Sequence, residues 1–390
     1  MEVEINNTYL EIQDFPTVYH EFPIIDSDIS YTEFFEKYFL RNQACLIRNV
    51  SNNWESSKFW VNKETPNFTN LEQSYGDLEV NVVDCKGKMD YSNQKPLKWT
   101  FKEYVEYWKN YKECAESLPV LYLKDWHLKN QMPKDNFYEV PLYFACDWLN
   151  EYLVDNSFDD YRFVYMGVNG TWSPFHVDVM TSYSWSTNIC GQKKWVLFPP
   201  GEEKYLTDPF GNLPNDIDSV KHDRKYFEVV QNAGDAIFVP SNWHHQVWNI
   251  KNTISINHNW FNGCNLHVIW QSMEKNLCEV KEEISDCNDM DNFLDHCQIM
   301  LKASFSLDFK DFFDIINYIA KKRLKFLNGG PIIRLTDKYT LGKYHSVFDL
   351  VSIKAVLIKL INHADLDELN FFKILQDAPL NLLSEIEDCT

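Results

Sequence analysis

Apolar residues change their spacing twice along the chain, and each spacing predicts a different kind of structure. In the first third, intervals of three and four residues predict helices over 31–40 and 99–111. Short apolar runs predict strands over 44–48 and 120–123. This part of the chain is therefore expected to mix helices and strands.

From about residue 160 the apolar runs become short, and turn-forming pairs such as Asn169-Gly170 separate them. These runs predict strands over 162–166, 175–179, 183–189, 194–198, 227–230, 236–239, 246–250 and 253–260. Many short strands without long helices between them indicate a barrel or a two-sheet jelly roll of the cupin kind.

After residue 262 the spacing becomes helical again. Apolar stripes predict helices over 266–284, 309–324, 347–363 and 366–376. The segment 279–295 holds seven acidic residues against one lysine, a pattern typical of a solvated surface. We expect these helices either to pack on the barrel or to associate with a second copy as a homodimer.

The fold class predicted from these three textures is α+β. An N-terminal mixed α/β segment (residues 1–120) supports a cupin-like double-stranded β-helix (121–264), and a helical C-terminal region (265–390) follows.

The composition of the chain argues against several classes of protein. Acidic residues outnumber basic ones by 57 to 37, and this net charge of −20 argues against direct binding to nucleic acid. None of the ten cysteines forms a C-x-x-C pair, and the first residues lack the regions of a signal peptide. No apolar run is long enough to cross a membrane. We therefore expect reduced thiols and a cytoplasmic protein, with the nucleus as the alternative.

The triplet His176-Val-Asp178 is the first candidate for chemistry. On a strand, positions two apart share a face, so this triplet supplies an imidazole and a carboxylate together. Two histidines and one carboxylate form the facial triad that binds non-haem Fe(II), although zinc accepts the same ligand types. Alone, the triplet is more typical of a buried histidine beside a capping aspartate. His244 and His245 follow on a later predicted strand and face opposite ways, and chemistry alone does not choose between them.

Several separate motifs occur in an order that resembles one known family. The chain is similar to JmjC-type Fe(II)- and 2-oxoglutarate-dependent oxygenases, and above all to a subgroup of protein lysyl hydroxylases. The matching motifs are Ser173-Pro-Phe-His-Val-Asp178, Gly191-Gln-Lys-Lys-Trp-Val-Leu-Phe-Pro-Pro200, Ala233-Gly-Asp-Ala-Ile-Phe-Val-Pro240 and Trp243-His-His-Gln-Val247.

This resemblance implies a role for each candidate residue. Counting back from Asn259, as the family spacing requires, assigns His245 as the partner of His176 and Asp178 in holding Fe(II). Lys193 is then expected to bind the far carboxylate of 2-oxoglutarate. The resemblance also suggests that further side chains complete the cofactor pocket: Tyr122, Ser173 and Asn259. One departure is Ser186, which stands where several relatives have an asparagine.

The same resemblance implies an activity. With O2 as co-substrate, the enzyme would hydroxylate a lysine carbon in a protein, and a translation termination (release) factor is the expected substrate. A JmjC lysyl demethylase and a catalytically inactive JmjC-fold interaction protein are the alternatives. A metal-dependent cupin isomerase or hydrolase is a third. The chain lacks a cysteine cluster or basic module of the kind that reads chromatin, which favours the hydroxylase.

Overall fold

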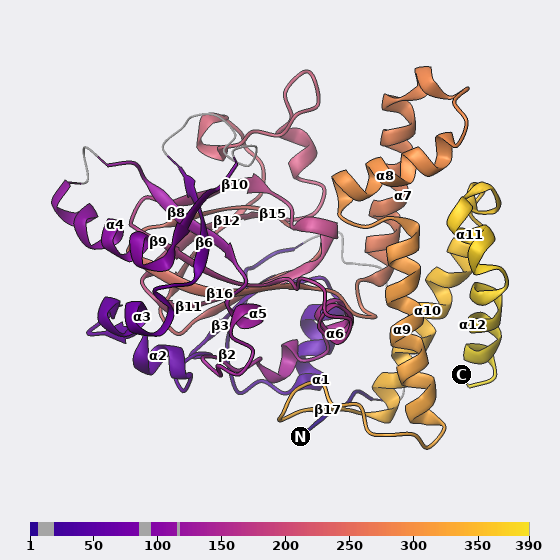
Figure 1. The fold of residues 1–390 in the computed structure, drawn as a ribbon, viewed down its shortest axis with the longest axis horizontal. Coiled ribbons are helices and arrows are strands. Elements are labelled where there is room, and N and C mark those ends of the chain that lie inside the picture. The colour runs from indigo at the N-terminus through magenta and orange to yellow at the C-terminus, as the bar shows by residue number, and fades with distance from the viewer. Residues whose placement is uncertain (7–18, 86–94, 115–117, 390) are drawn as a thin grey trace.

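Two β-sheets form the centre of the protein, as seen in a computed structural model that describes residues 1–6, 19–85, 95–114 and 118–389 (Figure 1). The major sheet has nine strands in the order β2-β3-β14-β11-β16-β9-β8-β6-β7. Its central strands are β8 (Leu121–Trp126), β9 (Arg162–Gly167), β11 (Tyr183–Cys190), β14 (Ala236–Val239) and β16 (Thr253–Trp260).

The minor sheet has four antiparallel strands in the order β10-β15-β12-β13. They are β10 (Trp172–His176), β12 (Gln192–Phe198), β13 (Phe227–Asn232) and β15 (His244–Asn249). Because the chain passes repeatedly between the two sheets, they form the double-stranded β-helix that the sequence predicts. The predicted α+β class is confirmed.

The N-terminal segment extends the major sheet at both of its edges. Strands β2 (Ile24–Asp26) and β3 (Cys45–Arg48) lie at one edge, and β6 (Glu79–Asp84) and β7 (Leu97–Thr100) lie at the other. Its helices are α1 (Tyr31–Phe34), which continues as a π-helical turn (Phe35–Phe39), α2 (Glu55–Phe59), α3 (Phe68–Tyr75) and α4 (Phe101–Cys114).

Two of the element boundaries that differ from the sequence prediction have a clear local cause or consequence. Helix α4 begins at Phe101 because Thr100 caps it: the Thr100 hydroxyl accepts from the Glu103 N–H at 3.3 Å, and the Glu103 carboxylate accepts from the Thr100 N–H at 2.7 Å. Strand β10 ends at His176, so Asp178 lies beyond it and begins the 3-10 turn Val179–Thr181.

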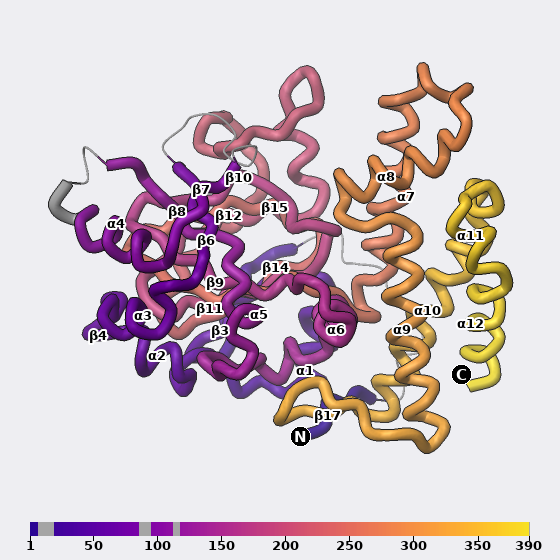
Figure 2. The backbone as a smooth tube through the Cα atoms, viewed as in Figure 1, coloured from indigo at the N-terminus to yellow at the C-terminus, as the bar shows by residue number. Residues whose placement is uncertain are grey.

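The C-terminal helices pack side by side at one end of the barrel (Figures 1 and 2). They are α7 (Leu266–Glu283), α8 (Phe293–Phe305), α9 (Phe309–Leu327), α10 (Lys343–Ile361), α11 (Asn370–Leu375) and α12 (Ala378–Glu387). The sequence did not predict α8 or α12. A helix α6 (Trp148–Asp155) lies between barrel and bundle.

One continuous apolar core joins the three segments of the chain, from Val3 through the barrel to Ile386. The short strand β1 (Glu2–Val3) also pairs in parallel with β17 (Thr340–Leu341), so the N-terminal residues lie beside the C-terminal region (Figure 2). Within the described residues, none of the helices has the length and apolar character needed to traverse a bilayer.

Candidate functional site

Two histidines face each other at the ends of neighbouring strands of the minor sheet. His176 is the last residue of β10, and it pairs across the ladder with His245 of β15. Their ring centres are 4.4 Å apart. The ligand atoms of these histidines and of Asp178 all lie within 4.8 Å of one another. The structure therefore brings together the three residues that the sequence predicts as a facial triad.

Backbone carbonyls hold both imidazoles in the same way. His176 Nδ1 lies 2.7 Å from the Pro174 carbonyl oxygen, and His245 Nδ1 lies 3.0 Å from the Trp243 carbonyl oxygen. Because a carbonyl only accepts, Nδ1 carries the proton in each ring, and Nε2 keeps its lone pair. Burial and the neighbouring His245 hold the pKa of His176 well below its usual range, which keeps this ligand neutral.

Side chains, rather than the backbone, orient the carboxylate. Asp178 accepts from the Ser184 hydroxyl at 2.6 Å and from the Asn259 amide at 3.0 Å. The Asn259 amide also donates to Ser182 Oγ at 3.2 Å. Each carboxylate oxygen has two lone pairs, so both bonds leave Asp178 able to bind a metal ion. Asn259, predicted as a cofactor contact, is thus also the partner of a ligand.

His244 occupies the opposite face of β15. Its ring packs against Phe175 at 5.6 Å between ring centres, and its Nδ1 is 3.9 Å from Glu203. Burial lowers the pKa of His244 to about 4. His245 belongs to the group of three neighbouring ligand atoms and His244 does not, so the strand register favours His245 as the candidate ligand.

A buried lysine lies deeper in the same pocket. Lys193 of β12 is 2% exposed, and its ammonium donates to Ser255 Oγ at 2.8 Å. Among the described residues no carboxylate lies within 4.0 Å of it. Burial, and then the neighbouring Lys124, lower the pKa of Lys193 to about 7. A buried ammonium without an anion is costly, so this position suits a ligand that brings a carboxylate.

The predicted residues line one cavity of about 500 Å³. The seven are Tyr122, Ser173, His176, Asp178, Lys193, His245 and Asn259. Tyr122 is buried on β8, and burial raises its pKa above the usual range, so it stays a neutral hydrogen-bonding group. The structure brings these residues together, and their contacts with a bound cofactor stay a prediction.

Sequence reasoning missed other residues that line the pocket. Lys124 and Tyr165 line it, and Lys124 lies 5.7 Å from the ring centre of Tyr165. Asn257, also in the lining, donates to Ser255 Oγ at 3.2 Å. A period of two was the available signal: Lys124 follows Tyr122, and Asn257 precedes Asn259, on the same face of their strands.

The departure at Ser186 leaves an unsatisfied group in the pocket. Its hydroxyl oxygen is buried, and within the described part of the chain it has no hydrogen-bond partner. A buried hydroxyl normally has a partner. Ser186 lines the same cavity as Lys193, so a ligand there would find an additional donor.

Comparison with known proteins places this pocket in a family. A family model described as a cupin-like domain matches residues 31–265. A Danio rerio protein named "2-oxoglutarate and iron-dependent oxygenase JMJD4" is 40% identical over 394 residues, which cover 95% of this chain and 92% of that protein. The Drosophila melanogaster homolog is 44% identical over 357 residues, covering 83% and 84%. The chain belongs to the JmjC family of oxygenases.

As a JmjC oxygenase, the protein is an enzyme that depends on iron, 2-oxoglutarate and O2. The site fits these groups: two imidazoles and a carboxylate are suited to Fe(II), and Lys193 is suited to a carboxylate. When bound, iron with 2-oxoglutarate and O2 supplies the oxidation of a C–H bond to an alcohol, with succinate and CO2 as co-products. An Arabidopsis thaliana protein named "Arginine-specific demethylase JMJ20" is 38% identical over 313 residues, covering 73% of this JmjC oxygenase and 67% of that protein.

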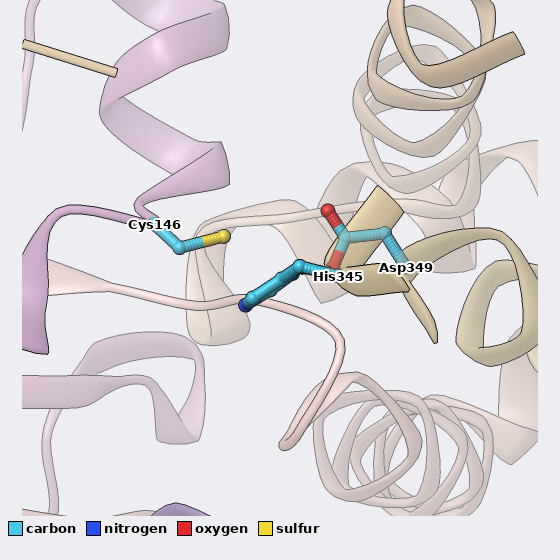
Figure 3. A group of neighbouring side chains, drawn as sticks. All are labelled: Cys146, His345 and Asp349. Carbon is cyan, nitrogen blue, oxygen red and sulfur yellow. Dashed lines mark ion pairs between the residues drawn. The ribbon is translucent and has the colours of Figure 1, made fainter. Parts of the chain in front are cut away.

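A second group of potential ligands in this JmjC oxygenase lies where the barrel meets helix α10, and its His345 Nδ1 and Asp349 Oδ1 are 3.1 Å apart (Figure 3). Cys146, before α6, points toward His345 and Asp349 of α10. The Tyr31 hydroxyl lies 2.6 Å from His345 Nε2, and Arg323 Nε donates to Asp349 at 3.0 Å. Burial raises the pKa of the Cys146 thiol well above its usual range, which disfavours a thiolate. The bonds of His345 to Tyr31 and of Asp349 to Arg323 link the N-terminal segment and helix α9 to helix α10.

Proposed function

We propose that this oxygenase hydroxylates a lysine side chain of a protein substrate. The observation that carries the proposal is the acidic approach to the triad. A second cavity, of about 1020 Å³, is called here the outer groove. It shares His176, Asp178 and Asn259 with the cavity of about 500 Å³ that holds the predicted residues, called here the cofactor pocket. Asp125, Asp159 and Asp160 also line it. A cationic side chain entering this groove would reach the triad past carboxylates.

The carboxylates of the outer groove differ in their availability. Asp160 is buried, which raises its pKa, but its contacts with His127 and then with Arg162 outweigh burial and hold that pKa below its usual range. Asp125 accepts from the Tyr165 hydroxyl at 2.6 Å, and Asp159 accepts from the Asn130 amide at 3.1 Å. Since these two bonds come from neutral donors, Asp125 and Asp159 keep their charge for a cation.

Charge therefore separates the two ligands along the pocket. The inner end, with Lys193, attracts the dianionic 2-oxoglutarate, and Lys124 lines both the inner cavity and the outer groove. The outer end, with Asp125 and Asp159, attracts an ammonium group. The resemblance to a subgroup of lysyl hydroxylases supports a translation termination factor as the protein that carries the target lysine. Cytoplasmic location and self-association through the C-terminal helices stay predictions.

The test incubates the purified enzyme with Fe(II), 2-oxoglutarate, air and a purified release factor, followed by peptide mass spectrometry. Gain of one oxygen on a lysine, together with succinate, is the expected result. His176→Ala should abolish both products, because it removes a triad ligand. His244→Gln is the matched control and should retain them, since His244 lies on the other face of the strand. An unmodified release factor with active enzyme would refute the substrate.

Demethylation is the second candidate function, because the Arabidopsis relative bears the name of an arginine demethylase. The same mass spectrometry decides between the two, with methylated lysine and arginine peptides as additional substrates. Loss of a methyl group, with formaldehyde, would establish the demethylase. A lasting gain of oxygen would establish the hydroxylase.

A further inference from the structure

The outer groove continues into a second cavity at the C-terminal helices. This cavity, called here the side hollow, has a volume of about 800 Å³ and shares Asp159 and Tyr161 with the outer groove. Its walls come from α6 and the following turn on one side, and from the end of α8 and the first turns of α9 on the other. The two cavities thus form one surface from the metal triad to the helical region.

The side hollow differs from the outer groove in chemistry. Apolar side chains line it, among them Leu153, Leu307 and Ile315. Its lysines are neutralised by acidic neighbours, with Lys302 at 2.9 Å from Asp311 and Lys310 at 2.5 Å from Asp314. Exposed ion pairs of this kind leave little net charge, so the side hollow presents mainly apolar surface.

Phe158 is the most exposed aromatic residue of this surface. It lines the side hollow with 53% of its area exposed, although its ring approaches Tyr152 at 6.1 Å. The turn that presents it is fixed: Ser157 has a φ of 60°, and the Phe158 N–H donates to the Leu153 carbonyl at 2.8 Å. A large apolar ring held at the surface gains free energy when a partner covers it.

We propose that outer groove and side hollow together bind an extended segment of the polypeptide substrate. The target side chain lies in the outer groove among Asp125 and Asp159, and an apolar side chain of the same segment lies against Phe158. Continuity with the triad and the change from acidic to apolar surface both match a basic residue followed at a fixed distance by an apolar one. The identity of the target residue rests on the proposed function, whereas the apolar contact does not.

This arrangement gives the C-terminal region a role in substrate choice. Leu307 lies between α8 and α9, and Ile315 lies in the second turn of α9, so the helical region supplies one wall of the binding surface. The barrel alone would hold the cofactor and the target side chain, and the helices would select the residues beside it.

The experiment measures peptide binding to the full chain loaded with Mn(II) and 2-oxoglutarate. Two randomised libraries are displayed, one with lysine at the centre and one with norleucine, its neutral counterpart. Peptides that bind should carry an apolar residue at one constant offset from the centre. Phe158→Ser should weaken their binding by about tenfold or more. Phe210→Ser is the control, because Phe210 is 89% exposed and lies outside both cavities.

The outcomes separate the two proposals. If both libraries bind equally and the peptides still carry an apolar residue at a constant offset, recognition of lysine is refuted and binding of an apolar side chain in the side hollow is supported. Absence of a constant offset, or unchanged binding by a folded Phe158→Ser variant, would overturn the inference. Light scattering tests whether a second copy of the chain occupies the side hollow instead. If the wild type is a dimer and Phe158→Ser converts it to a monomer, a second copy fills the side hollow, and the proposed binding of a substrate segment is wrong.

Discussion

Replacing Lys193 by methionine should stabilise the ligand-free protein and weaken 2-oxoglutarate binding. Methionine keeps the length of the side chain and removes its charge. Burial lowers the pKa of Lys193 from 10.5 to about 7. Each pKa unit corresponds to about 1.4 kcal/mol, so burial disfavours the charged form by roughly 5 kcal/mol, of which we expect about 3–5 kcal/mol to be measurable.

The pH dependence follows from the direction of this shift. Between pH 7 and 10.5 the unfolded chain carries the proton of Lys193 and the folded protein does not, so the free energy of unfolding rises with pH over this window. Below pH 7 the full penalty is present. The advantage of Lys193→Met over the wild type should therefore be largest at pH 6–7 and should shrink toward pH 10. Urea denaturation of the ligand-free proteins measures it.

Cofactor binding should change in the opposite sense. Loss of the buried cation that faces a carboxylate costs about 3–5 kcal/mol, which weakens 2-oxoglutarate binding by about two to four orders of magnitude. In the wild type, binding takes up a proton above pH 7, so affinity should fall by up to about tenfold per pH unit. Calorimetry with Mn(II) present gives both quantities.

Lys194→Met provides the matched control. Lys194 precedes Trp195 on the same strand, is partly exposed, and pairs with Glu228 at 3.2 Å. Its replacement should change stability and 2-oxoglutarate affinity by less than about 1 kcal/mol. If Lys193→Met binds 2-oxoglutarate as the wild type does, or if both variants behave alike, the assignment of Lys193 is wrong.

Two further predictions concern single contacts. Asn259→Ala removes the amide that orients Asp178, so metal affinity should fall about 10–100-fold in a Mn(II) titration. If metal affinity is unchanged and 2-oxoglutarate binds more weakly, Asn259 contacts the cofactor instead. Arg323→Met leaves Glu151 and Asp349 without their buried cation, so the free energy of unfolding measured in urea should fall by about 3–5 kcal/mol. The control is Lys322→Met: Lys322 is partly exposed, so this replacement should lower the free energy of unfolding by less than about 1 kcal/mol. Equal losses in the two variants would contradict this account.

The barrel strands could be predicted from sequence because they depend on local alternation of apolar and polar residues. The family spacing selected His245, and the structure shows the physical reason, which is the register that pairs β10 with β15. The strand containing His176 was extended too far, since the pattern of apolar residues continues past the point where Asp178 begins a turn. That turn includes Met180 at a φ of 58°, a conformation that no local pattern indicated.

Contacts between distant residues could not be predicted. Asp178 and Asn259 are separated by 81 positions, and Arg323 and Glu151 by 172. Arg323 lies within a helical stripe that the sequence predicts, yet only the tertiary structure buries it. Helix α8 begins after Asn292, at a φ of 63°, at the end of an acidic run that we interpreted as a solvated surface. The acidic residues there interrupt the apolar pattern, so the pattern does not indicate where the helix begins.

Backbone groups hold two ligands of the triad and side chains hold the third, so mutations would affect the three ligands unequally. The carbonyls of Pro174 and Trp243 fix the two imidazoles, and a backbone carbonyl persists whatever side chain occupies its position. The carboxylate depends instead on the side chains of Ser184 and Asn259, each of which a single codon change can remove. Sequence drift in this lineage would therefore erode the site first at its carboxylate corner, while both histidines kept their orientation.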